Sequence, residues 1–200
     1  MFPLAHIYLA EKYFDKLTNE IKFGTTIPDF LTMLPIISIE DTHKLLINFD
    51  YPDFARAWNL HILLDNYSEE KYFYPLTPDD IRQEMGKYVG HIFVETALDY
   101  ILLENGIYYS PPKIEGHIIP HLEKYFKKDL TLFIPYFKLF VIWDREKYLD
   151  HLADSILYIC GVHHHVLTKS EVENLIDDCK DVLPDYEKLF ADLLANVKLD

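Results

Sequence analysis

The sequence predicts an all-α fold in a single domain of residues 1–200, on three observations. Apolar residues recur at helical spacing (i, i+3, i+4) along most of the chain. No segment alternates apolar and polar residues as a half-buried strand would. Half of the residues are hydrophobic and 15% are aromatic, which is enough to bury one sizeable core. We therefore expect one compact multi-helix bundle.

The first quarter of the chain predicts two helices separated by a loop. Apolar residues from Leu4 to Ile21 keep helical spacing and give a first helix that ends near Gly24. The stretch GTTIPDF, with its glycine and proline, predicts a loop that reaches Asp29. Leu45, Leu46 and Phe49 predict a short helix.

Two longer helices follow, and each has a recognisable start. Pro52 opens a helix that runs through Asp65, since proline suits the first helical position. The stretch TPDD from Thr77 places a cap, a proline and two acids at the start of the next helix. That helix should end near Asn105-Gly106, because both residues favour a helix C-terminus.

Five more helices are expected after a loop at 108–113 that contains two prolines. Helical spacing gives their ranges as Glu115–Phe126, Leu130–Ile142, Arg145–Cys160, Lys169–Lys180 and Pro184–Val197. Ser170 and Glu173 have the spacing of a capping box at the fourth of these helices. The loop at 108–113 is the best internal boundary, but neither half would bury much surface alone.

The chain is strongly acidic, with 33 acidic and 19 basic residues and a formal net charge of −14. Such a charge repels polyanions and disfavours general nucleic-acid binding through a basic surface, so we expect none. A substrate that carries phosphate would need a bound cation to offset this repulsion locally.

Cysteine content and apolar segments predict where the protein resides. Cys160 and Cys179 provide no disulfide framework and indicate free thiols in a reducing compartment. The N-terminal stretch lacks the basic region of a signal peptide. No apolar stretch reaches the roughly 18 to 20 residues that a membrane span needs. We expect a soluble cytoplasmic protein without a transmembrane segment.

Two pairs of ionisable residues interrupt otherwise apolar helical stretches. His61 and Asp65 lie four residues apart in NLHILLDNY. His91 and Glu95 do so in GHIFVETALDY, with Asp99 one turn further. The spacing puts both members of a pair on the same side of a helix. No lysine or arginine lies within a turn of Asp65 or Glu95, so a buried acid would need another partner.

Each pair is either a satisfied core pair, in which the acid bonds the histidine, or part of a shared metal site. Imidazole and carboxylate are ligands of zinc, iron or manganese rather than of calcium, which prefers oxygen alone. The residues that helices and a loop could bring to such a site are His6, Asp29, His61, Asp65, His91 and Glu95.

The order of these residues resembles the zinc-dependent phospholipase C and single-strand nuclease superfamily. The matching pattern is His6, Asp29 in GTTIPDF, His43, His61-x-x-x-Asp65 and His91-x-x-x-Glu95. The resemblance implies a helical fold that holds up to three zinc ions. By position, it implies metal ligands at His6, His43, His61, Asp65, His91 and Glu95, and a catalytic carboxylate at Asp29 that deprotonates or orients water.

The chain departs from that pattern at two ligand positions. It begins with Met1-Phe2 where the family uses an N-terminal tryptophan. It also lacks the histidine that the family places shortly after the His-x-x-x-Asp motif. One or two metal ions are therefore expected rather than three.

A second and weaker resemblance is to the acyl-carrier-protein phosphodiesterases, which are distant relatives of the HD-type phosphohydrolases. It is carried by FPLAHIYLA, GTTIPDF, NLHILLD and KYVGHIFVETALDYIL. That family has an Asp-His pair near the position of Leu98 to Tyr100, where this chain has Asp99 followed by Tyr100. HD-type enzymes likewise place histidines and aspartates from several helices around a metal.

Both resemblances imply hydrolysis of a phosphoric ester by water activated at a divalent metal, with zinc preferred and iron or manganese as alternatives. The substrate would be a small phosphodiester or phospholipid-like molecule, whose identity the sequence does not define. The alternative is a catalytically inactive helical protein that binds or supports a partner. The missing ligand positions favour it, as does the small number of arginines, since phosphate sites often recruit arginine.

Overall fold

The computed structural model describes residues 3–33, 37–131, 133–140, 147–162 and 164–199, and helices form all of their regular secondary structure. The predicted all-α class is thus confirmed. The longer helices are α1 (Pro3–Tyr13), α2 (Asn19–Met33), α4 (Pro52–Ser68), α6 (Asp79–Glu104), α9 (Tyr148–Val162), α10 (Lys169–Val182) and α11 (Tyr186–Asn196). The shorter ones are α3 (Ile39–Thr42), the π-helix η1 (Glu69–Phe73), α5 (Tyr74–Leu76), α7 (Ile119–Phe126) and α8 (Phe133–Phe140).

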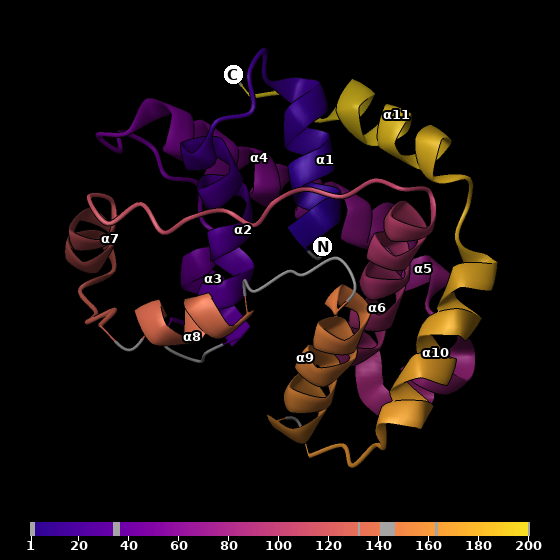
Figure 1. Cartoon of the computed structure of the whole chain (residues 1–200). Helices are drawn as coiled ribbons and strands as arrows, with labels where there is room; N and C mark the ends of the chain where they lie inside the picture. Colours follow the sequence, from indigo (N-terminus) through magenta and orange to yellow (C-terminus); the bar gives the residue numbers. More distant parts are fainter. Residues whose placement is uncertain (1–2, 34–36, 132, 141–146, 163, 200) are drawn as a thin grey trace.

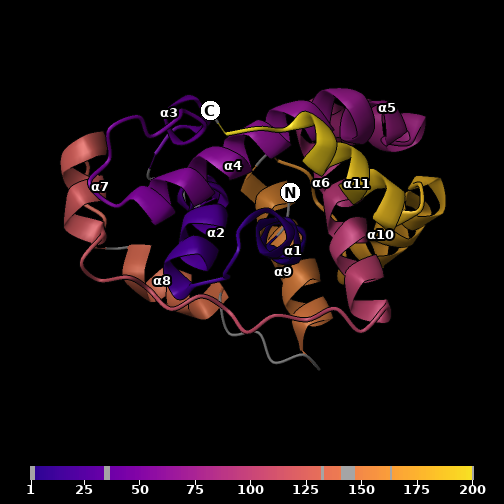
Figure 2. The ribbon, with the colours of Figure 1, turned by 90° about the horizontal axis from the view of Figure 1, so that it is seen from above.

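Helix α1 lies near the middle of the molecule, between two groups of helices (Figures 1 and 2). Helices α2 and α4 pack against each other on one side of α1, and α6, α9 and α10 lie together on the other side. One cluster of buried apolar side chains runs from Leu4 to Val197 and joins the two groups. No helix in the described parts of the chain has the length and apolar character that a membrane crossing requires.

The contact between α2 and α4 explains why the loop predicted at GTTIPDF is wrong. Gly24 lies in the middle of α2 and faces α4. A Cβ at this position would lie 2.6 Å from the backbone oxygen of Phe54 and 3.0 Å from the Cβ of Ala57. The glycine therefore permits close approach of two helices rather than ending one, and Asp29 lies on a helix.

Two other predicted helices in this region are also wrong. The segment from Leu4 to Ile21 is divided between α1 and the first turn of α2 by the non-helical residues 14–18. Residues 45–49 are not helical and contain a turn at 47–48, and the short helix lies earlier, in α3. Its N-terminus is capped by the Ser38 side chain, which accepts a hydrogen bond from the backbone N–H of Asp41.

Local chemistry sets the helix ends further along the chain. Helix α6 ends at the predicted Asn105-Gly106, where the glycine has a φ of 76°. The capping box of α10 consists of Thr168 and Glu171, whereas the prediction placed it at Ser170 and Glu173. The predicted box is wrong because both of its residues already lie inside the helix.

The first and last residues of the remaining helices of the second half lie within four residues of the predicted bounds. The predicted boundaries at Ile142 and Arg145 lie outside the residues that the structure describes.

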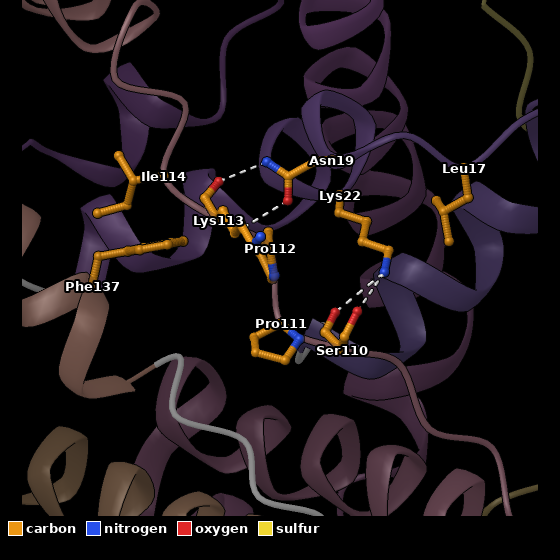
Figure 3. A pocket seen from close by; sticks show the side chains of 9 residues that line it. All are labelled: Leu17, Asn19, Lys22, Ser110, Pro111, Pro112, Lys113, Ile114 and Phe137. Atoms are coloured by element: carbon orange, nitrogen blue, oxygen red, sulfur yellow. Dashed lines mark hydrogen bonds between the residues drawn. The ribbon is translucent and has the colours of Figure 1, made fainter.

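The segment 107–118 has no helix and crosses the outside of α1 and α2 on its way from α6 to α7 (Figure 1). Side chains of α2 hold it in place: Lys22 Nζ donates to Ser110 Oγ at 3.0 Å, and Asn19 Nδ2 donates to the backbone oxygen of Lys113 at 2.9 Å. These residues line a cavity of about 670 Å³ (Figure 3). None of the predicted site residues lines this cavity.

Candidate metal centre

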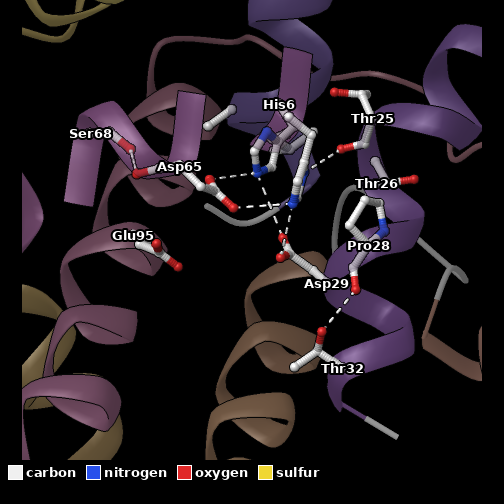
Figure 4. A network of polar contacts seen from close by, with 12 residues as sticks. His6, Thr25, Thr26, Pro28, Asp29, Thr32, Asp65, Ser68 and Glu95 are labelled. Atoms are coloured by element: carbon white, nitrogen blue, oxygen red, sulfur yellow. Dashed lines mark hydrogen bonds and ion pairs between the residues drawn. The ribbon is translucent and has the colours of Figure 1, made fainter. Parts of the chain in front are cut away.

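Helices α1, α2 and α4 bring four predicted site residues together: His6, Asp29, His61 and Asp65. Figure 4 labels three of them, His6, Asp29 and Asp65. One imidazole nitrogen or carboxylate oxygen of each lies within 4.8 Å of those of the other three. We call these four residues the first group. His43, which follows α3, adjoins them with its Nε2 3.5 Å from Asp65 Oδ2.

The distances within the first group resemble those between ligands of one metal ion. The Nε2 atom of His61 lies 3.1 Å from Asp65 Oδ2 and 3.3 Å from Asp29 Oδ1. The Nε2 atom of His6 lies 3.3 Å from Asp65 Oδ1 and 3.6 Å from Asp29 Oδ2. Ligand atoms about 2.0–2.1 Å from a tetrahedral ion stand about 3.3–3.4 Å apart. The group therefore has the dimensions of a coordination shell.

The orientation of His61 leaves one ring nitrogen directed at the carboxylates. Its Nδ1 lies 2.9 Å from the backbone oxygen of Thr25, which can only accept a hydrogen bond. Nδ1 therefore carries the proton, and Nε2 faces Asp29 and Asp65. A lone pair at Nε2 would face carboxylate lone pairs, so either a second proton or a cation must lie there. A backbone carbonyl that fixes the tautomer of a histidine is also a common feature of metal sites.

The group is buried, and solvent reaches it chiefly at Asp29 and His43. The side chains of His6 and His61 have no exposed area, whereas 24% of Asp29 and 18% of His43 is exposed. Within the described part of the chain, neither ring nitrogen of His6 makes a hydrogen bond, nor does Nε2 of His61. The Nε2 atoms of both histidines lie 3.1–3.6 Å from Asp29 and Asp65, an arrangement compatible with either a histidine–carboxylate ion pair or a bound divalent metal.

The charges of the first group follow from its burial and its mutual contacts. Burial alone would lower the pKa of His61, but the carboxylates of Asp65 and Asp29 raise it to about 10. Burial lowers the pKa of His6 to about 4, and the positive charge of His61 adds to this effect. Burial opposes ionisation of Asp29, yet His61 brings its pKa down to about 2. Without a metal, one imidazolium thus lies between two carboxylates.

A second group of potential ligands consists of Glu69, His91 and Glu95. The Nε2 atom of His91 lies 3.7 Å from one carboxylate oxygen of each acid. Tyr74 donates a hydrogen bond of 2.8 Å to the other oxygen of Glu69 and packs its ring edge-on against His91. Burial raises the pKa of Glu95, and the negative charges of Asp65 and Glu69 contribute in the same direction.

Glu69 is a candidate ligand that the sequence prediction missed. It begins the π-helix η1 and follows Asp65 by four residues, as Asp65 follows His61. This continued spacing was the available signal, because residues at i, i+4 and i+8 share one side of a helix. Single-turn π-helices are frequent at functional sites. Glu69 also lies shortly after Asp65, where the phospholipase C pattern expects a histidine.

The structure thus divides the predicted site residues between two neighbouring groups, one around the C-terminal part of α4 and the other between η1 and α6. The first group contains His6, Asp29, His61 and Asp65, the second contains His91 and Glu95, and His43 lies beside the first. Both donor sets are compatible with a divalent metal.

Comparisons of the chain with known protein families, with curated proteins and with solved structures found no match in any of the three. The resemblance to the zinc-dependent phospholipase C superfamily, including its fold, therefore stays a prediction.

Proposed function

We propose that this chain is a metal-dependent hydrolase of phosphoric esters that acts at the two groups of potential ligands. The proposal depends chiefly on one observation: two sets of imidazole and carboxylate ligands lie one helical turn apart, at Asp65 and Glu69. Cations held at two neighbouring groups could together stabilise the negative charge of a phosphoryl group. Cations would also reduce, at the site, the repulsion that a chain of net charge −14 exerts on an anionic substrate.

Zinc is the preferred metal, with iron or manganese as alternatives. With Asp29 left to orient water, the first group offers two imidazoles and one carboxylate, and the second offers one imidazole and two carboxylates. Such mixed nitrogen and oxygen donors suit these metals better than calcium. A bound metal would lower the pKa of a coordinated water and polarise the phosphoryl oxygen.

The roles of the protein residues follow from their positions. His6, His61, Asp65, His91 and Glu95 would hold the metals, with Glu69 and His43 as further ligands. Asp29 is the best candidate for the residue that orients the attacking water, because it is ionised and its side chain is the most exposed of the first group.

An assay of three chromogenic esters tests the proposal: bis(p-nitrophenyl) phosphate, p-nitrophenyl phosphate and p-nitrophenyl acetate. We expect hydrolysis of at least one phosphoric ester, abolition of that activity by a chelator, and its recovery when zinc, iron or manganese is returned. The double variant His61→Ala, His91→Ala should be inactive. The variant His117→Ala should keep full activity, because this exposed histidine belongs to neither group.

Two results would contradict the proposal. A chain that binds metal at both groups but hydrolyses no phosphoric ester would be a metal-binding protein of another kind. A chain that binds no metal would support the alternative, a helical binding or structural protein with paired core histidines and acids.

A further inference from the structure

Asp99 is a buried acid that the proposed function leaves without a role. It lies on α6, four residues after Glu95, and has no exposed surface. Its Oδ2 accepts a hydrogen bond from the backbone N–H of Leu4 at 3.1 Å, and its Oδ1 accepts one from Ala5 at 2.8 Å. The hydroxyl of Tyr148, on α9, donates to Oδ2 at 2.6 Å.

These contacts fix the N-terminal turn of α1. The first N–H groups of a helix have no partner within the helix, and Asp99 supplies one for two of them. Because each carboxylate oxygen binds a different N–H, the contact sets both the position and the rotation of α1 relative to α6.

The placement of α1 matters for His6, which follows Ala5 directly. His61 is oriented by its bond to the Thr25 oxygen, and His43 Nδ1 lies 2.9 Å from Thr42 Oγ1. Neither ring nitrogen of His6 makes a hydrogen bond within the described residues. Its ring stacks on that of His61 at a centroid distance of 3.9 Å. The backbone of α1 is therefore the main determinant of where His6 meets Asp29 and Asp65.

We propose that Asp99 is a positioning residue for the metal centre, because it holds α1 so that His6 completes the first group. This inference depends on the proposed function for the identity of the ligand, although the placement of His6 can be measured without it. Asp99 would link the two groups, since the helix that provides His91 and Glu95 also orients the helix that provides His6.

A double-mutant cycle with Zn²⁺ as the probe tests this proposal, using competition with a chelating dye. The measured quantity is the Zn²⁺ affinity of the first group, identified as the site whose affinity is lower in His6→Ala. We expect Asp99→Asn to lower that affinity by about 10- to 100-fold. In a His6→Ala background the same change should lower it by less than about twofold, because the effect passes through His6. Glu104→Gln, an exposed acid on α6, is the matched control and should have no effect.

Equal losses in both backgrounds, or no loss in the native background, would overturn the proposal. If Asp99→Asn fails to fold, Tyr148→Phe removes one of the three donors and should weaken binding by about 2- to 10-fold, again only when His6 is present.

NMR of the metal-free chain tests the role of Asp99 separately from the proposed function. The ring signals of His6 are assigned by their absence from the His6→Ala spectrum. Asp99→Asn should shift the signals of His6 and leave those of His117 unchanged. Absence of Zn²⁺ affinity in the native chain would refute the metal centre. If the His6 signals of Asp99→Asn also matched those of the native chain, the role of Asp99 would be refuted as well.

Discussion

At the scale of single residues, His61 determines what the first group can do. Its Nδ1 donates to the Thr25 carbonyl, so its Nε2 faces Asp29 and Asp65 and must meet a proton or a cation. The two interpretations of the sequence, a core pair and a metal ligand, differ only in what occupies this position. The i, i+4 spacing with Asp65 was visible in the sequence. The Thr25 carbonyl was not, because a backbone atom from a distant segment leaves no pattern.

Metal binding at the first group should release about one proton from His61 at pH 7. The reason is that the pKa of His61 is raised to about 10 without metal, whereas an imidazole ligand is neutral. Zn²⁺ affinity should accordingly increase as the pH rises towards 10. Calorimetric titrations in buffers of different ionisation enthalpy measure the released protons. Binding without proton release, or the same release in His61→Ala, would contradict the assignment.

Asp29→Asn should keep the metal and lose hydrolysis, if Asp29 orients water. The amide preserves the shape of the side chain but is a much weaker acceptor for the proton of the attacking water. We expect the rate to fall by about 100- to 10,000-fold, with the metal content unchanged. Elemental analysis and steady-state kinetics on the same sample decide this. Loss of the metal would instead make Asp29 a ligand.

At the scale of elements, the sequence predicts that the elements are helices and where most of them lie. It does not predict which helices contact each other. Helix α6 ends at Asn105-Gly106 because the stop is encoded locally. Gly24 looked like a similar stop, yet its role depends on Phe54 of α4, thirty residues away. A glycine that ends a helix and a glycine that allows two helices to approach closely look the same in a sequence. Glu69 was missed because η1 extends the ligand side of α4 by a further turn.

Gly24→Ala should lower the free energy of unfolding by about 1–3 kcal/mol, because the added methyl would meet the Phe54 carbonyl at 2.6 Å. This loss should exceed the gain in helix propensity, which favours alanine by about 1 kcal/mol. Urea denaturation measures the difference. Gly116→Ala is the matched control, since an added Cβ there meets no atom within 4 Å. Equal stability of the two variants would show that the α2–α4 contact has been misjudged.

Thr168→Ala should lower the free energy of unfolding by about 1 kcal/mol, since Thr168 caps α10. Ser170→Ala, at the position that the sequence had suggested, should change it by less than about 0.5 kcal/mol. The same urea denaturation separates the two positions. A larger loss for Ser170→Ala would restore the sequence-based prediction of the capping box.

At the scale of the whole molecule, α1 and the two groups of helices around it assemble the candidate centre. All of its residues come from the first half of the chain, between His6 and Glu95. The second half supports them: Tyr148 of α9 bonds Asp99, and Asp192 of α11 accepts hydrogen bonds from Tyr67, Lys71 and Tyr72 around η1. Folding thus gathers acids and histidines from α1, α2, α4, η1 and α6 into two neighbouring groups.

Elemental analysis of the purified chain, prepared without a histidine tag or added metal, tests this account most directly. It should be done on the native chain, on the double variant His61→Ala, His91→Ala, and on His117→Ala. We predict one or two equivalents of zinc, iron or manganese in the native chain and in His117→Ala, and none in the double variant. Absence of these metals from the native chain, together with no uptake when they are supplied, would contradict the metal centre and the function proposed from it.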